Sequence, residues 1–124
     1  MNKTLKVIRR AVEVLKRDGW IKGKLHENAY ASELDQRGSH CMIGAVEQAY
    51  DELTTEGILE RKGFGRGPEY YDALNILALE VNGGETAYDA SSTIATFNDA
   101  SATTFEQVRS MFQGALRKIK EGSF

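Results

Sequence analysis

Hydrophobic residues recur at helical spacing along most of this chain, and the clearest case is residues 3–18. Apolar positions three and four residues apart fall on one side of a helix, while lysine and arginine fill most of the other side. Asp18-Gly19 is the predicted end, because glycine readily takes the left-handed conformation that follows many helices. The stripe of this first predicted helix consists of Leu5, Ile8, Val12 and Leu15.

A second helix is predicted over about residues 40–53, with Ser39 as its N-cap. Gly44 and Ala45 would leave a narrow surface on which another helix could pack closely. The apolar positions that repeat at helical spacing here are Met42, Val46, Ala49 and Leu53.

Three more helices are predicted in the second half of the chain. One begins at Pro68, which suits the first turn of a helix, and ends at Asn82. A short helix covers residues 91–98. The last begins at Thr103 or Thr104, because each has a Glu or Gln three residues later, as in a capping box.

Residues 21–39 show no clear period, apart from a possible helical turn near residues 29–34. A structureless connection of this length is unusual in a compact domain. We therefore expect this segment to have a function or to pack against the rest of the fold. No β-hairpin signal or internal repeat is evident. The expected fold class is all-α, a compact array of four to five helices forming one domain over residues 1–124.

The composition is that of a globular protein, with 41% hydrophobic and 27% charged residues in 124. A single cysteine excludes an intramolecular disulfide, which fits a reducing compartment. There is no apolar run of about 18 residues for a membrane span, and charge interrupts the N-terminal stretch too often for a signal peptide. We therefore expect a cytoplasmic protein with no membrane partner.

Charge is segregated although the net charge is only −2. Residues 1–24 carry eight basic and two acidic side chains, a net of +6, and residues 109–124 carry a net of +3. Residues 25–108 carry four basic and fifteen acidic side chains, a net of −11. The basic ends could bind nucleic acid, but no aromatic residues interleave them for base stacking, and pairing with the acidic middle is the favoured interpretation.

His40-Cys41 is the stretch with the clearest chemical potential. A thiol at the first turn of a helix can be an activated nucleophile, because free amides and the helix dipole lower its pKa. A lone cysteine can equally be a small buried apolar residue, and adjacent side chains rarely form a nucleophile–base pair. Asn98 or Asp99 could orient a base or substrate, so the weak catalytic candidates are His40, Cys41, Asn98 and Asp99.

A metal site would have to combine His26, His40 and Cys41 with Asp35 or Glu33. The chain has no closely spaced His/Cys pairs of a structural zinc site. We therefore expect no metal and no other cofactor.

A glycine-rich loop, GFGRG, precedes Pro68. It lacks the pattern of a phosphate-binding loop and has one cation, so turn formation is its expected role. The loop could still expose Phe64 and Arg66, which are the candidate residues for contact with a partner.

Four short motifs together resemble a family of small uncharacterised proteins found in actinobacteria and their phages. The family usually has Trp where this chain has Phe97, and no activity is established for it. The resemblance suggests that Trp20, Cys41, Asn98 and Asp99 meet around one buried seam, as a structural hub. The motifs are Gly19-Trp20-x-x-Gly23, Cys41-x-x-Gly44-Ala45, Phe97-Asn98-Asp99 and Thr104-x-Glu106-x-Val108.

The favoured function is that of a small helical binding protein, as a phage or mobile-element accessory factor that engages a host macromolecule. Its partner is expected to be a protein, contacted through the acidic middle and the GFGRG loop. The alternatives are a thiol-dependent enzyme using Cys41 and a nucleic-acid binder using the first helix and the C-terminal tail. The chain could be a monomer or a homodimer.

Overall fold

The computed structural model describes residues 2–27, 38–61, 63 and 65–122. The all-α prediction is confirmed: these residues form five helices and no strand. The possible turn near residues 29–34 lies outside the described residues. None of the described helices is long and apolar enough to cross a bilayer. The helices are α1 (Asn2–Asp18), α2 (Met42–Thr55), α3 (Pro68–Val81), α4 (Ala90–Asp99) and α5 (Phe105–Lys120).

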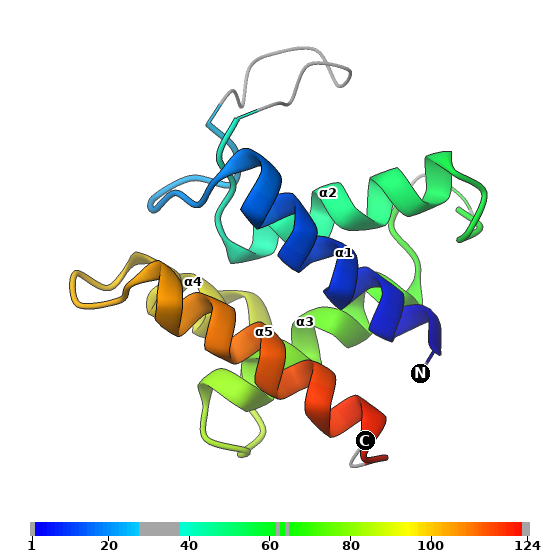
Figure 1. Ribbon diagram of the computed structural model, residues 1–124. Helices are drawn as coiled ribbons and strands as arrows, with labels where there is room; N and C mark the ends of the chain where they lie inside the picture. The colour runs from blue at the N-terminus through cyan, green and yellow to red at the C-terminus, as the bar shows by residue number, and fades with distance from the viewer. Residues whose placement is uncertain (1, 28–37, 62, 64, 123–124) are drawn as a thin grey trace.

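α3 is the central helix, because it packs against all four others. Its sequence explains this position, since apolar residues surround more than half of its circumference. α1 lies between α2 and α5 and also touches α3 (Figure 1). The C-terminal end of α5 lies near the N-terminal end of α1, so the two basic ends of the chain are neighbours (Figure 1). The buried residues of α3 are Tyr70, Ala73, Leu74, Ile76, Leu77 and Ala78.

α1 faces the core with a stripe rotated by roughly 80° from the predicted one. Ile8 and Leu15 are buried as expected, but Leu5 and Val12 are only partly buried and form an edge of the buried stripe. The centre of the stripe is shifted because α1 packs against three helices rather than one. The other buried residues of α1 are Thr4, Val7, Ala11 and Val14.

The start of α2 differs from the prediction. Cys41, not Ser39, is the N-cap, and the helix begins at Met42 rather than His40. His40 is instead extended, and its backbone bridges to Trp20 and to His26. Those bridges keep residue 40 out of helical geometry, which moves the cap two residues along the chain.

Gly44 permits a close approach, but not the helix contact that was predicted. A Cβ at this position would clash with the carbonyl group of Leu25. The segment of residues 20–26 therefore lies directly on the first turn of α2, and the prediction of a helix partner at Gly44 was wrong.

The later helix ends follow local rules. Pro68 occupies the first turn of α3 as predicted, and Asp89 caps α4. The capping box of α5 is formed by Thr104 and Gln107. The Thr103 hydroxyl instead donates to the carbonyl oxygen of Phe97, which ties the α4–α5 connection to α4.

Candidate functional site

Two buried histidines face each other where the segment of residues 20–26 meets α2. Nδ1 of His26 lies 2.7 Å from Nδ1 of His40, and the rings are nearly perpendicular. His40 is fully buried and His26 is 7% exposed. Outside this contact, Nε2 of His40 lies 2.8 Å from Oδ2 of Asp18, and Nε2 of His26 lies 3.1 Å from Oε1 of Glu47. We call these four residues, Asp18, His40, His26 and Glu47, the histidine relay.

Backbone hydrogen bonds hold both histidine residues of the relay in place. The His40 N–H donates to the Gly19 carbonyl, and the His40 carbonyl accepts from Ile21. Gly19 has a positive φ of 101°, which turns the chain from the end of α1 toward His40. The Cys41 N–H donates to the Leu25 carbonyl, which places His26 beside the start of α2.

Charged residues flank each end of the relay. At one end, hydrogen bonding from Arg17 lowers the pKa of Asp18 against the effect of burial, and His40 adds to this. At the other end, Glu47 Oε2 lies 3.6 Å from Arg66 and 3.4 Å from the Tyr70 hydroxyl. Arg17 therefore favours the ionised form of Asp18.

Burial controls the protonation of the innermost ring. Burial lowers the pKa of His40, and it outweighs the hydrogen bond to Asp18, which acts in the opposite direction. A positive charge on His26 would lower it further. A second positive charge in this pair is therefore disfavoured. The relay can hold and share protons, but His40 has no exposed surface through which it could reach a substrate.

Cys41 lies beside the relay and caps α2. Its Sγ accepts a hydrogen bond from the Gly44 N–H at 3.3 Å, and the residue is 7% exposed. Burial raises the pKa of the thiol and outweighs the backbone amides of the helix start, which act to lower it. The geometry thus gives Cys41 a structural role as an N-cap and does not favour a thiolate at neutral pH.

The structure also brings together residues from the motif set. The Trp20 indole Nε1 donates to Asn98 Oδ1 at 2.7 Å, and the same oxygen accepts the Met42 N–H at 3.0 Å. Asn98 Nδ2 donates to the Ile21 carbonyl. Asp99 is exposed and accepts the Gly23 N–H. Asn98 therefore joins the turn after α1, the start of α2 and the end of α4.

The predicted partner loop has a more constrained geometry than expected. Arg66 forms ion pairs with Asp51 and Glu47, and its guanidinium lies 5.3 Å from the centre of the Tyr70 ring. Phe64 lies outside the described residues. The contacts of Arg66 anchor the start of α3 to α2, so this cation is already engaged within the fold.

No metal site is evident among the residues that the structure describes. They contain no cluster of three or more His, Cys, Asp or Glu side chains that could hold an ion. Glu33 and Asp35 lie outside the described part of the chain. His26 and His40 face each other through nitrogens already in hydrogen-bond contact.

Asp18 and Glu47 were not predicted as site residues. Asp18 was interpreted only as part of a helix stop, and Glu47 was one of many charged residues on a predicted helix. One signal was available: the chain has only two histidines, and one lies within its longest irregular segment while the other follows that segment directly. That position hints at a contact across the segment, but it does not identify the carboxylates that complete it.

The basic ends pair only in part with the acidic middle. Arg10 and Arg17 of α1 both reach Glu52 on α2, and Lys118 of α5 reaches Glu80 on α3. Other cations on α1 and α5 form no ion pair with any described residue. They are considered below under the proposed function.

Comparison with known proteins identifies the family of this chain but no activity. Neither the curated proteins nor the solved structures contain a match. A family model described as a family of unknown function, DUF6197, matches residues 1–118. The chain therefore belongs to the family of unknown function DUF6197.

Proposed function

We propose that this protein binds the phosphate backbone of a nucleic acid on a surface formed by α1 and α5. The observation that carries the proposal is a group of cations on these neighbouring helices with no ion pair among the described residues. We call this surface the basic face, and it consists of Arg9, Lys16, Arg109, Arg117 and Lys120.

The contribution of α1 follows from helix geometry. Arg10 marks the edge of α1 that pairs with α2. At 100° per residue, Leu5 and Val12 lie roughly 150° around the helix from Arg10, on the edge of α1 that faces away from α2. Arg9 and Lys16 each follow one of these residues by four positions and so lie on the same side. Both are exposed.

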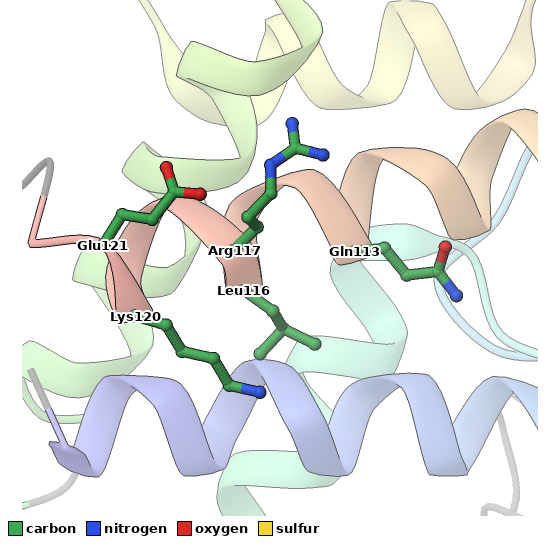
Figure 2. A pocket seen from close by; sticks show the side chains of 5 residues that line it. All are labelled: Gln113, Leu116, Arg117, Lys120 and Glu121. Carbon is green, nitrogen blue, oxygen red and sulfur yellow. The ribbon is translucent and has the colours of Figure 1, made fainter.

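The contribution of α5 can be followed in Figure 2, where Leu116 and Lys120 extend from α5 toward α1. Together with Gln113, Arg117 and Glu121 they line an open hollow of about 490 Å³. Two cations and one carboxylate line this hollow. Its charge therefore favours an anionic ligand.

Arg109 adds an unsatisfied donor to the basic face. It lies four residues before Gln113 on α5, and its buried Nε has no hydrogen-bond partner among the described residues. A buried donor without an acceptor is unfavourable.

The same features favour contact with a nucleic-acid backbone over contact with unstacked bases, and over binding of an acidic protein. Trp20 and Phe105, the aromatic residues where α1 and α5 meet, stack on each other with ring centres 6.1 Å apart. They are occupied within the fold, which argues against base stacking as the mode of binding. Two rows of cations on adjacent helices match the repeated charge of a duplex. A phage or mobile-element accessory factor would meet such a ligand in the cytoplasm.

The test is the binding of a fluorescent DNA duplex of mixed sequence, measured by anisotropy at increasing salt. We expect the affinity to fall roughly 100-fold or more between 50 and 200 mM salt, as for a protein that contacts about four phosphates. Lys120→Glu should weaken binding about tenfold. Lys24→Glu, an exposed charge reversal outside the basic face, is the matched control.

Several results would overturn this proposal. They are an absence of binding at low salt, binding that ignores salt, or equal losses in the Lys120 and Lys24 variants. Poly-glutamate that binds more tightly than the duplex would assign the surface to an acidic protein instead.

A further inference from the structure

A chain of three hydrogen bonds runs through the histidine relay, and its protons can be counted. Each bond needs one hydrogen, and an ionised carboxylate can only accept. Nε2 of His40 therefore donates to Asp18, and, with Glu47 likewise acting as an acceptor, Nε2 of His26 donates to Glu47. The third hydrogen lies between the two Nδ1 atoms, which are 2.7 Å apart.

This count gives three ring protons on two imidazoles. Two neutral rings carry only two, so the pair holds one extra proton and one positive charge. One charge between two carboxylates is a favourable arrangement for a buried site, because buried charges need partners.

We propose that His26 and His40 share this single extra proton and form an acid-sensitive latch that holds the segment of residues 20–26 on the first turn of α2. The latch closes while the two Nδ1 atoms share one hydrogen. A fourth proton places N–H groups on both facing nitrogens, and their repulsion removes the central bond. The proposal does not depend on nucleic-acid binding.

The contacts around the relay show what the latch holds. Ile21 donates to the His40 carbonyl and Cys41 donates to the Leu25 carbonyl, so both backbone bonds join the segment to the start of α2. Gly44 lets the Leu25 carbonyl approach α2 closely. Opening of the central bond would therefore loosen these backbone contacts, and the Cys41–Leu25 bond more than the Ile21–His40 bond, because Asn98 also holds Ile21.

Charged and titratable groups from every neighbouring element act on the pair. Arg17 and Asp18 approach from α1, and Glu47 from α2. Arg66 and Tyr70 approach Glu47 from the start of α3. Cys41 is adjacent to His40 in the chain. Burial raises the pKa of its thiol, so the thiol is uncharged in the pH range in which the histidines titrate.

The direction of the pH effect follows from His40. Its pKa in the closed state lies below the usual 6.5, mainly because of burial. The open state therefore takes up a proton more readily as the pH falls below 6.5, and proton uptake favours opening. The latch is therefore lost as the pH falls below this value. Because the closed pair holds one proton more than two neutral rings, removal of that proton at higher pH also breaks the central bond.

The first test is hydrogen exchange of the Ile21 and Cys41 amides in the wild-type protein at pH 7 and pH 5, corrected for intrinsic exchange. We expect their protection to fall at least tenfold at pH 5, while the Phe112 amide in α5 keeps its protection. The chain has only two histidines, so no other imidazole can cause a transition in this range. Unchanged protection of Ile21 and Cys41 would overturn the latch.

A second test needs no variant. Nitrogen-15 spectra of the histidine rings at pH 7 should show three ring N–H groups shared by two rings, and only two would overturn the shared proton. His26→Gln keeps a donor toward Glu47 but removes the facing nitrogen. It should lower the protection of Ile21 at pH 7 and abolish the difference between pH 7 and pH 5. A pH dependence that persists in this variant would also contradict the proposal.

Discussion

Trp20 and Asn98 are 78 residues apart in the sequence, yet the indole Nε1 donates to Asn98 Oδ1 at 2.7 Å. The same oxygen accepts the Met42 N–H, and the amide nitrogen of Asn98 donates to Ile21. Asn98 is 1% exposed. One buried amide side chain therefore fixes three parts of the fold relative to one another.

Asn98→Ala should be strongly destabilising. It leaves the Trp20 indole and the Met42 amide without their acceptor, and each unsatisfied buried donor costs about 1–3 kcal/mol. We expect a loss of roughly 3 kcal/mol in the free energy of unfolding, measured by urea denaturation. Asn75→Ala, at an exposed position of α3, is the control and should change stability by less than about 0.5 kcal/mol. Similar losses in both variants would show that the contacts of Asn98 are not responsible.

Gly44→Ala should destabilise the joint between the segment of residues 20–26 and α2. The added methyl group would clash with the Leu25 carbonyl, and backbone cannot move aside as easily as a flexible side chain. Overpacking of this kind typically costs about 1–3 kcal/mol. The matched control is Gly65→Ala, because a Cβ at Gly65 meets nothing within 4 Å. A thermal denaturation midpoint that falls only in the Gly44 variant supports this packing, and equal midpoints would contradict it.

The helices were predictable because their signals are local. The end of α1 at Asp18, the start of α3 at Pro68 and the capping box at Thr104 each depend on residues within one or two turns. Errors arose where a distant segment intervened. Cys41 replaced Ser39 as the N-cap because His40 is held extended by two other parts of the chain.

The site was less predictable because its contacts are not local. His26 and His40 are 14 residues apart, and no periodicity within that interval brings them together. Asp18 joins the relay through the turn at Gly19, which bonds to His40, and Glu47 joins it because His26 lies beside the start of α2. The partial pairing of the basic ends likewise depends on which faces of α1 and α5 remain uncovered.

Cys41 should react slowly in the folded protein. Burial raises its pKa above the usual 9.0, so the thiolate population at pH 7–8 is small and the sulfur is poorly accessible. A thiol reagent should therefore modify the native protein far more slowly than the protein in denaturant. The pH midpoint of the native reaction should lie above the usual value. Fast native labelling with a midpoint well below it would instead indicate an activated nucleophile.

Glu52 should make stability depend on pH in the acid range. Burial raises its pKa, but hydrogen bonds from Arg17 and Gln48 outweigh burial and bring the pKa below the usual 4.5. A lowered pKa in the folded state means that the stabilisation is fully present above 4.5 and is lost as the pH falls through the folded-state value.

Glu52→Gln should therefore reduce stability at pH 7 by about 0.5–1 kcal/mol, the range for partly exposed ion pairs. The gap between the variant and the wild type should narrow as the pH falls toward 3, because protonation of Glu52 removes the charge that the variant lacks. Glu60→Gln removes an exposed carboxylate with no ion pair among the described residues and should leave stability unchanged at both pH values. Chemical denaturation of all three proteins at pH 7 and pH 3 decides the matter, and a gap of equal size at both would mean that the charge of Glu52 is not the cause.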